Sequence, residues 1–179
     1  MKLCNYAVTI IFLLISIRAN AQSFYQNKYT DTNKSIIDFS TFKGQTVMVV
    51  NIATRCGFTG QLDDIEKLYK KYQSKKFKIV GFPSSNFGGQ TPESNDEVGK
   101  FCRLKYGATF PIIEKQNVIG NNKTPIYKWL NSQKGFESEV AWNFEKFIIG
   151  PDGRILGRFP SQVGPLDKSI TSLIEKNIQ

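Results

Sequence analysis

Cys56 lies where a thiol would be most reactive in this 179-residue chain. A β-branched apolar run, Thr46–Ala53, ends just before it, and an amphipathic run, Thr59–Gln73, begins just after it. A cysteine at such a strand-to-helix junction is near the unpaired first amides and the positive dipole of the helix. Both features favour the thiolate, which is the nucleophilic form of cysteine. We therefore predict thiol chemistry at Cys56.

The composition restricts the kind of chemistry. The chain has no histidine, which excludes Ser-His-Asp triads, Cys-His dyads and His-ligated metal sites. Apart from Cys4 near the N-terminus, the cysteines are Cys56 and Cys102. Two thiols cannot build a zinc ribbon or hold an iron–sulfur cluster, but they can form one disulfide. We expect no metal site and no bound cofactor.

The first residues have the pattern of a secretory signal. Lys2 gives a positive start, Ala7–Ile17 is a mostly apolar core of 11 residues, and Ala19-Asn20-Ala21 fits a small-x-small cleavage site. A bilayer span needs about 20 apolar residues, so no transmembrane anchor is expected. We predict a signal peptide at 1–21, cleavage near Ala21, export to the periplasm or the extracellular space, and one domain at 22–179. A short buried N-terminal helix is the alternative.

The chain is basic, with a net charge of +9, or +7 without Lys2 and Arg18. Its lysines are scattered along the sequence and form no single basic arm. Scattered lysines are typical of a solvated surface, so we predict no nucleic-acid partner.

The elements around Cys56 read as a strand–helix–strand unit. Thr46–Ala53 is almost continuously apolar, which favours a strand covered on both faces. Thr59–Gln73 has a helical apolar stripe with acidic residues early and lysines late. Phe77–Phe82 is a second buried strand. A right-handed βαβ unit with parallel strands follows.

The rest of the chain completes one α/β domain with a central mixed sheet flanked by helices. Ser94 and Glu97 form a capping box for a helix that runs to about Tyr106 and carries Cys102. The other expected elements are an N-terminal hairpin of Phe24–Tyr29 with Ile36–Phe39, a strand-like run at Thr109–Ile113, a short helix at Thr124–Leu130, a hairpin of Asn143–Ile149 with Arg154–Phe159, and a closing helix at Pro165–Ile178 with Ile170, Leu173 and Ile174 inward.

The surroundings of Cys56 suit a single reactive thiol. A dithiol oxidoreductase has a second cysteine three residues after the first, where this chain has Thr59. Such enzymes also have a proline before the strand that faces the site, where this chain has Ala141-Trp142-Asn143. The alternative, a buried structural cysteine, is disfavoured by the flanking Arg55 and Gly57.

Four blocks, in order, carry a resemblance to a known family: ATRCGFTG, FPSSNFGGQTPES, GATFPIIEK and WNFEKFIIGPDG. Together they resemble the cysteine-containing, non-selenium glutathione peroxidases of the thioredoxin-dependent type, from about Phe24 to the C-terminus. The resemblance implies a thioredoxin-like fold and reduction of hydrogen peroxide and organic or lipid hydroperoxides. It implies Cys56 as the catalytic thiol with Gln90, Trp142 and Asn143 around it, and no selenocysteine, haem or metal.

The chemistry explains why these residue types fit. A peroxidatic thiolate attacks a peroxide oxygen and becomes a sulfenic acid. The amides of Gln90 and Asn143 and the indole N–H of Trp142 can donate to the thiolate and to the developing oxygen charge. Taken singly, each has an ordinary alternative: a solvated loop residue, a turn former and a core aromatic, respectively.

The resemblance also implies a resolving role for Cys102, which lies 46 residues after Cys56. Cys102 would attack the Cys56 sulfenic acid and close a disulfide, which a thioredoxin-like dithiol protein or glutathione would reopen as co-substrate. Ser84 stands where relatives often have a cysteine, so Cys102 is the remaining candidate. The alternative is an inert cysteine in the core.

The short stretch between Leu130 and Trp142 implies, by the same resemblance, a monomer with an open site that would admit lipid hydroperoxides. No clear set of arginines for glutathione lies near the site. Two other functions stay open: a thiol–disulfide exchange protein, and a non-enzymatic thiol redox sensor that passes its oxidised state to a partner.

Overall fold

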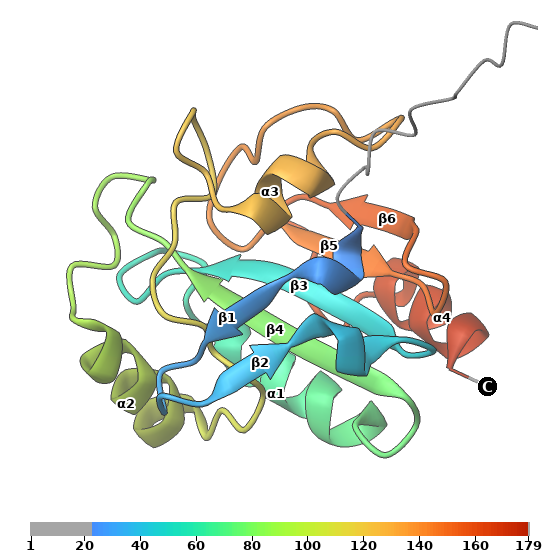
Figure 1. Cartoon of the computed structure of the whole chain (residues 1–179). Coiled ribbons are helices and arrows are strands. Elements are labelled where there is room, and N and C mark those ends of the chain that lie inside the picture. Colours follow the sequence, from blue (N-terminus) through green and yellow to red (C-terminus); the bar gives the residue numbers. More distant parts are fainter. Residues whose placement is uncertain (1–22, 179) are drawn as a thin grey trace, which may run out of the picture.

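The computed structural model describes residues 23–178 (Figure 1). The predicted signal peptide, 1–21, lies outside this range and stays a prediction. Among residues 23–178, no helix has the length and hydropathy to cross a membrane.

A four-stranded sheet with the order β4-β3-β5-β6 forms the centre. Strand β3 is parallel to β4 and antiparallel to β5, and β6 is antiparallel to β5, so the predicted mixed sheet is confirmed. Every residue of β3 is buried, because both faces of the sheet are covered. The strands are β3 (Thr46–Ile52), β4 (Phe77–Pro83), β5 (Lys146–Ile149) and β6 (Ile155–Phe159).

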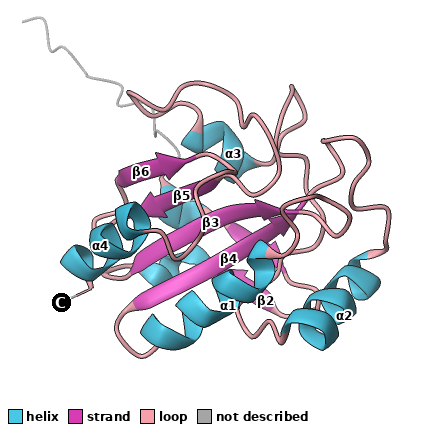
Figure 2. Ribbon diagram, turned by 180° about the vertical axis from the view of Figure 1, so that it is seen from behind, coloured by secondary structure: helices cyan, strands magenta, loops and turns pink. Residues whose placement is uncertain are grey.

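One face of the sheet is covered by α1 (Gln61–Tyr72) and α4 (Lys168–Asn177), as Figure 2 shows. Met48, Val50 and Ile52 of β3 point to this side and share a buried cluster with residues of both helices. The alternation is that of a strand, whose successive side chains point to opposite faces. In α4, Ile170 and Ile174 are buried, whereas Leu173, which we expected inward, is only half-buried.

The opposite face is covered by α3 (Pro125–Leu130) and by the N-terminal hairpin of β1 (Lys28–Thr30) and β2 (Ile36–Asp38). The hairpin is confirmed, but its first strand is shorter than predicted. Phe24–Gln26 forms a 3-10 turn instead, and Phe24 packs among Phe39 and Trp129.

Helix α2 (Asn95–Tyr106) lies beside the β4 edge of the sheet (Figure 1). Its predicted capping box is present: the Ser94 hydroxyl accepts from the Glu97 N–H, and the Glu97 carboxylate accepts from the Ser94 N–H. Gly107, with φ +65°, ends the helix in the left-handed conformation that glycine adopts without strain.

Two predicted strands are wrong in extent. Thr109–Ile113 makes only isolated bridges, one of them between Ile112 and Gly81, because Pro111 lacks the N–H that a continuous ladder requires. The strand predicted from Asn143 begins at Lys146 instead. Phe144 has φ +63°, which lies outside the extended region, so a regular strand does not run through it.

Candidate active site

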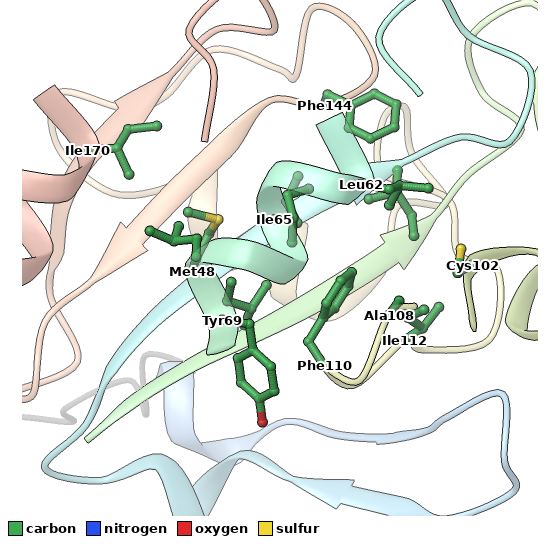
Figure 3. Packing of buried hydrophobic residues seen from close by; sticks show 14 of the residues in the cluster. Met48, Leu62, Ile65, Tyr69, Cys102, Ala108, Phe110, Ile112, Phe144 and Ile170 are labelled. Carbon is green, nitrogen blue, oxygen red and sulfur yellow. The ribbon is translucent and has the colours of Figure 1, made fainter. Parts of the chain in front are cut away.

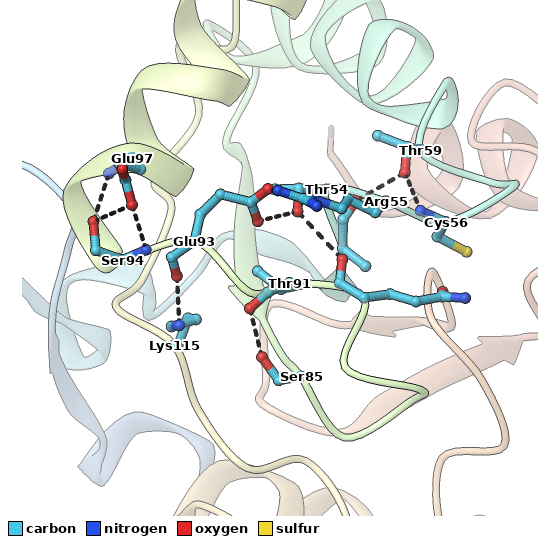
Figure 4. Close-up of polar contacts among 12 residues, drawn as sticks. Thr54, Arg55, Cys56, Thr59, Ser85, Thr91, Glu93, Ser94, Glu97 and Lys115 are labelled. Carbon is cyan, nitrogen blue, oxygen red and sulfur yellow. Dashed lines mark hydrogen bonds and ion pairs between the residues drawn. The ribbon is translucent and has the colours of Figure 1, made fainter.

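Cys56 lies in a tight turn between the end of β3 and the start of α1. Its thiol is half-buried and reduced, and the Phe58 N–H donates to its Sγ at 3.4 Å. Thr59, at the position of the absent second cysteine, shapes this turn: its hydroxyl accepts from the Cys56 N–H at 2.9 Å and donates to the Ala53 carbonyl at 3.0 Å (Figure 4). The thiol is therefore partly accessible, and a backbone N–H donates to its sulfur.

Gln90 is attached by its backbone to the residues just before Cys56. Its carbonyl accepts from the Arg55 N–H at 2.9 Å and from the Thr54 N–H at 3.2 Å. Gly88 and Gly89 have φ of +60° and +64°, which allows the chain to turn back toward the end of β3. A loop that is distant in sequence thus brings an amide side chain to the edge of the cysteine turn.

Asn143 meets Gln90 directly. Its Nδ2 donates to Gln90 Oε1 at 2.9 Å, and the Asn143 side chain is fully buried. Because the Gln90 oxygen is occupied, the amide end of Gln90 that stays available is Nε2, a donor. No described residue accepts from it. The buried Oδ1 of Asn143 likewise has no partner among the described residues.

Trp142 is 40% exposed, which is unusual for a tryptophan. Its ring lies 5.4 Å from the ring of Phe87, centroid to centroid. Phe87 belongs to the same loop as Gln90. Trp142 and Asn143 therefore both contact this loop. The structure therefore brings Gln90, Trp142 and Asn143 together, around the loop that is bonded beside Cys56.

Asn51 connects β3 to the Trp142–Glu145 segment, a contact that the sequence did not predict. Its Nδ2 donates to the Trp142 carbonyl at 3.0 Å, and its Oδ1 accepts from the Glu145 N–H at 3.0 Å. Its backbone carbonyl accepts from the Phe144 N–H at 2.7 Å. The strand that leads to Cys56 therefore also holds the Trp142–Glu145 segment. An amide near the end of an apolar buried strand was the available signal, since such a group must find partners.

Glu93 fixes the residues before Cys56 from a third side (Figure 4). The Thr54 hydroxyl donates to its carboxylate, and Arg55 Nε donates to its Oε1 at 2.9 Å. Burial acts to raise the pKa of Glu93, but these hydrogen bonds and the Arg55 charge hold that pKa below its ordinary value. Glu93 is thus an anion that keeps Arg55 in place.

Cys102, the predicted resolving residue, is fully buried on α2 and reduced. Figure 3 shows it in the hydrophobic cluster that also contains Ala108 and Ile112. Burial raises the pKa of the Cys102 thiol to about 12. In this state Cys102 is not bonded to Cys56 and is not a nucleophile.

Ser84, which stands where relatives often have a cysteine, and the nearby Thr91 both have structural uses. The Ser84 hydroxyl donates to Asn86 Oδ1 at 2.8 Å, and the buried Thr91 hydroxyl donates to the Ser84 carbonyl at 2.8 Å. Both side chains stabilise the loop that carries Gln90. Within the part of the chain that the structure describes, no group of three or more acidic, cysteine or histidine side chains could hold a metal ion.

Comparison with known proteins gives the family. The family model for glutathione peroxidase matches residues 24–131. The chain is 44% identical over 160 residues to glutathione peroxidase-like peroxiredoxin 2 of Saccharomyces cerevisiae, covering 86% of this chain and 98% of the relative. It is 40% identical over 157 residues to the glutathione peroxidase homolog BsaA of Staphylococcus epidermidis, covering 87% and 98%.

Solved structures give the fold. The crystal structure of Trgpx in its apo form has a TM-score of 0.70 at 35% identity, covering 88% of this chain and 97% of that one. A thiol:disulfide interchange protein of the thioredoxin family from Chlorobium tepidum has a TM-score of 0.65 at 18% identity, covering 90% and 99%, which shows the fold alone. The chain has the thioredoxin-like fold, belongs to the glutathione peroxidase family, and is a thiol peroxidase.

Proposed function

We propose that Cys56 is the peroxidatic residue and that it reduces hydrogen peroxide and organic hydroperoxides. The observation that carries the proposal is the half-buried Cys56 thiol, whose sulfur accepts a hydrogen bond from the Phe58 N–H. The residue before it, Arg55, donates its backbone N–H to the Gln90 carbonyl, which places Gln90 beside the thiol. The absence of a second cysteine at Thr59 supports a single attacking thiol and disfavours protein disulfide exchange.

In the first step the Cys56 thiolate attacks one peroxide oxygen. An S–O bond forms, the O–O bond breaks, and hydroxide or alkoxide leaves and takes up a proton, which gives Cys56 sulfenic acid. Negative charge moves from sulfur to the leaving oxygen. Donors aimed at that region stabilise the transition state, and we assign this role to Gln90 Nε2 and the Trp142 indole N–H. Loss of one such donor costs about 3 to 4 kcal/mol in comparable sites.

Asn143 has a different role in this proposal from the one its residue type suggested. Its Nδ2 donates to Gln90, so it orients Gln90 with the donor end outward. It is a positioning residue in the reduced enzyme.

In the second step Cys102 attacks the sulfur of the Cys56 sulfenic acid, an S–S bond forms, and hydroxide leaves to become water. Cys102 must first leave the core, because its thiolate is not populated there near neutral pH. Two ties of α2 to the N-terminal hairpin must loosen: Arg103 Nη1 donates to Thr32 Oγ1 at 3.2 Å, and Lys34 pairs with Asp96 at 3.0 Å.

A thioredoxin-like dithiol protein then reduces the disulfide, with glutathione as the other candidate reductant. We propose a monomer whose partly exposed Trp142 borders an open site, which would accept lipid hydroperoxides. We also propose export after cleavage near Ala21. N-terminal sequencing of the protein recovered from the expressing cell's exterior or periplasm tests this.

The test of function is peroxide consumption by the reduced protein, with thioredoxin plus its reductase or with glutathione as reductant. The proposal expects many turnovers with thioredoxin, none for Cys56→Ser, and a single oxidation without turnover for Cys102→Ala. Consumption that stops after one equivalent in the wild type, with either reductant, would indicate a redox sensor instead.

A further inference from the structure

The turn Pro160–Val163 lies in the segment between β6 and α4, and it is hydrogen-bonded both to Asn143 and to the first residue of α1. It is closed by the Val163 N–H donating to the Pro160 carbonyl at 3.1 Å. Ser161 within it is 3% exposed. No motif in the sequence singled out this residue.

The Ser161 hydroxyl donates to the backbone carbonyl of Asn143 at 2.6 Å. Asn143 in turn donates from its side chain to Gln90. The Ser161 hydroxyl therefore holds the backbone of Asn143, whose side-chain amide orients Gln90. The segment needs such fixing because Phe144, the next residue, has a positive φ that is costly for a non-glycine residue.

The Ser161 carbonyl accepts from two other directions. Gln61 Nε2 donates to it at 2.6 Å, and Lys146 Nζ lies 3.4 Å from it. Gln61 is the first residue of α1, the helix that follows the Cys56 turn, and Lys146 is the first residue of β5. Ser161 thus connects the cysteine's helix to the segment of Asn143.

Lys146 also stabilises the turn Pro160–Val163. The side chain is fully buried, and its ammonium also donates to the Val163 carbonyl at 2.5 Å. Burial lowers the pKa of Lys146 to about 8. A buried cation is costly unless it is hydrogen-bonded, so its two carbonyl partners must stay in place. The turn is therefore anchored independently of the Ser161 hydroxyl.

We propose that Ser161 is a positioning residue for peroxide reduction. It holds Asn143 in place, and Asn143 in turn holds the Gln90 amide in its position relative to the Cys56 thiol. The inference rests on the proposed role of Cys56. Because it acts through Asn143, loss of the hydroxyl should slow oxidation of Cys56 and leave the later attack by Cys102 unchanged. We expect a decrease of about 10-fold, less than the 10²-fold that a 1 Å misplacement can cost.

The test is the second-order rate constant of Cys56 oxidation, measured by rapid mixing of the reduced full-length protein with hydrogen peroxide. Ser161→Ala should be slow, and Ser161→Thr, which keeps the hydroxyl, should recover most of the rate. Thr46→Val is the matched control. The Thr46 hydroxyl is also buried and donates to a remote carbonyl, that of Asn177 at 2.9 Å, but at the other end of β3.

Thr46→Val should therefore lose stability without losing rate. In the Asn143→Ala background, Ser161→Ala should have no further effect on the rate, because residues that act as a unit are not additive.

Wild-type-like oxidation of Ser161→Ala would overturn the inference while leaving the proposed function intact. An equal slowing in Thr46→Val, or an additive effect in the Asn143→Ala background, would also overturn it, since the effect would then be structural. Failure of the wild type to oxidise at Cys56 would instead refute the proposed function, and this inference with it.

Discussion

Asn143 Nδ2 donates to Gln90 Oε1 at 2.9 Å, across 53 residues of sequence. This bond decides which end of the Gln90 amide stays free, and leaves the donor. It also joins two loops on different sides of β3, one bonded to Arg55 and the other bonded to Asn51. The nucleophile and its neighbours are therefore positioned by one strand.

Replacement of Gln90 by glutamate tests the donor role. A carboxylate can still accept from Asn143, but it cannot donate and adds negative charge near Cys56. We expect Gln90→Glu to slow oxidation of Cys56 by about 10²-fold, measured by rapid mixing with hydrogen peroxide. Gln73→Glu, which introduces the same charge at the exposed far end of α1, should leave the rate unchanged. Equal rates in the two variants would contradict the assignment.

Replacement of Asn51 by leucine tests whether β3 holds the Trp142–Glu145 segment in place. The variant leaves the Trp142 carbonyl and the Glu145 N–H without their partner. We expect a loss of about 2 to 6 kcal/mol in the free energy of unfolding, measured in urea, because each of the two groups left without a partner costs about 1 to 3 kcal/mol. Oxidation of Cys56 should also slow. An unchanged unfolding free energy would show that Asn51 does not hold this segment.

The tie between Arg103 and Thr32 should limit how fast Cys102 reaches Cys56. Arg103→Met removes the hydrogen bond and keeps most of the apolar stem. We expect disulfide formation after the first oxidation to become about 3- to 10-fold faster, since a lost hydrogen bond of about 1 kcal/mol favours opening. Lys100→Met, on an exposed position of the same helix, should have no effect. Slower closure in Arg103→Met would refute the opening of α2.

Burial of Cys102 makes a prediction about pH. Its folded pKa of about 12 is above its ordinary value of 9.0, so folding favours the protonated thiol. This contribution is fully present below about pH 9 and is lost as the pH rises toward 12. Relative to Cys102→Ala, the wild type should lose about 2 kcal/mol of unfolding free energy between pH 8 and pH 10.5. Lys146 is present in both proteins, so its own titration cancels in the difference.

A difference in unfolding free energy that does not change with pH would show that Cys102 is solvated in the folded protein. The resolving step would then need no opening of α2.

The sequence predicted most of the elements because their signals are local. The apolar run before Cys56, the stripe of α1 and the Ser94–Glu97 capping box each depend on near neighbours. Their structure follows from propensity, amphipathic pattern and capping. The family and the fold could also be predicted, since each of the four motif blocks is a continuous stretch of sequence.

The tertiary part of the site was not predictable in the same way. The bond from Asn143 to Gln90, the contacts of Asn51 and those of Ser161 join residues that are distant in sequence. The expectation that Asn143 donates directly at the thiol remains untested, and its amide is bonded to Gln90 instead. The positive φ of Phe144 also gave no sequence signal, because tertiary contacts impose it on a residue that disfavours it.

The proposed cycle oxidises Cys56 and resolves it with Cys102. It is tested by the intact mass and free-thiol count of the reduced protein, prepared as residues 22–179, after one equivalent of hydrogen peroxide. We expect a loss of two hydrogen atoms and of both thiols, reversed by reduced thioredoxin. A gain of one oxygen atom on Cys56, with Cys102 still free, would refute the resolving role of Cys102 and indicate a one-cysteine peroxidase that depends on an outside thiol.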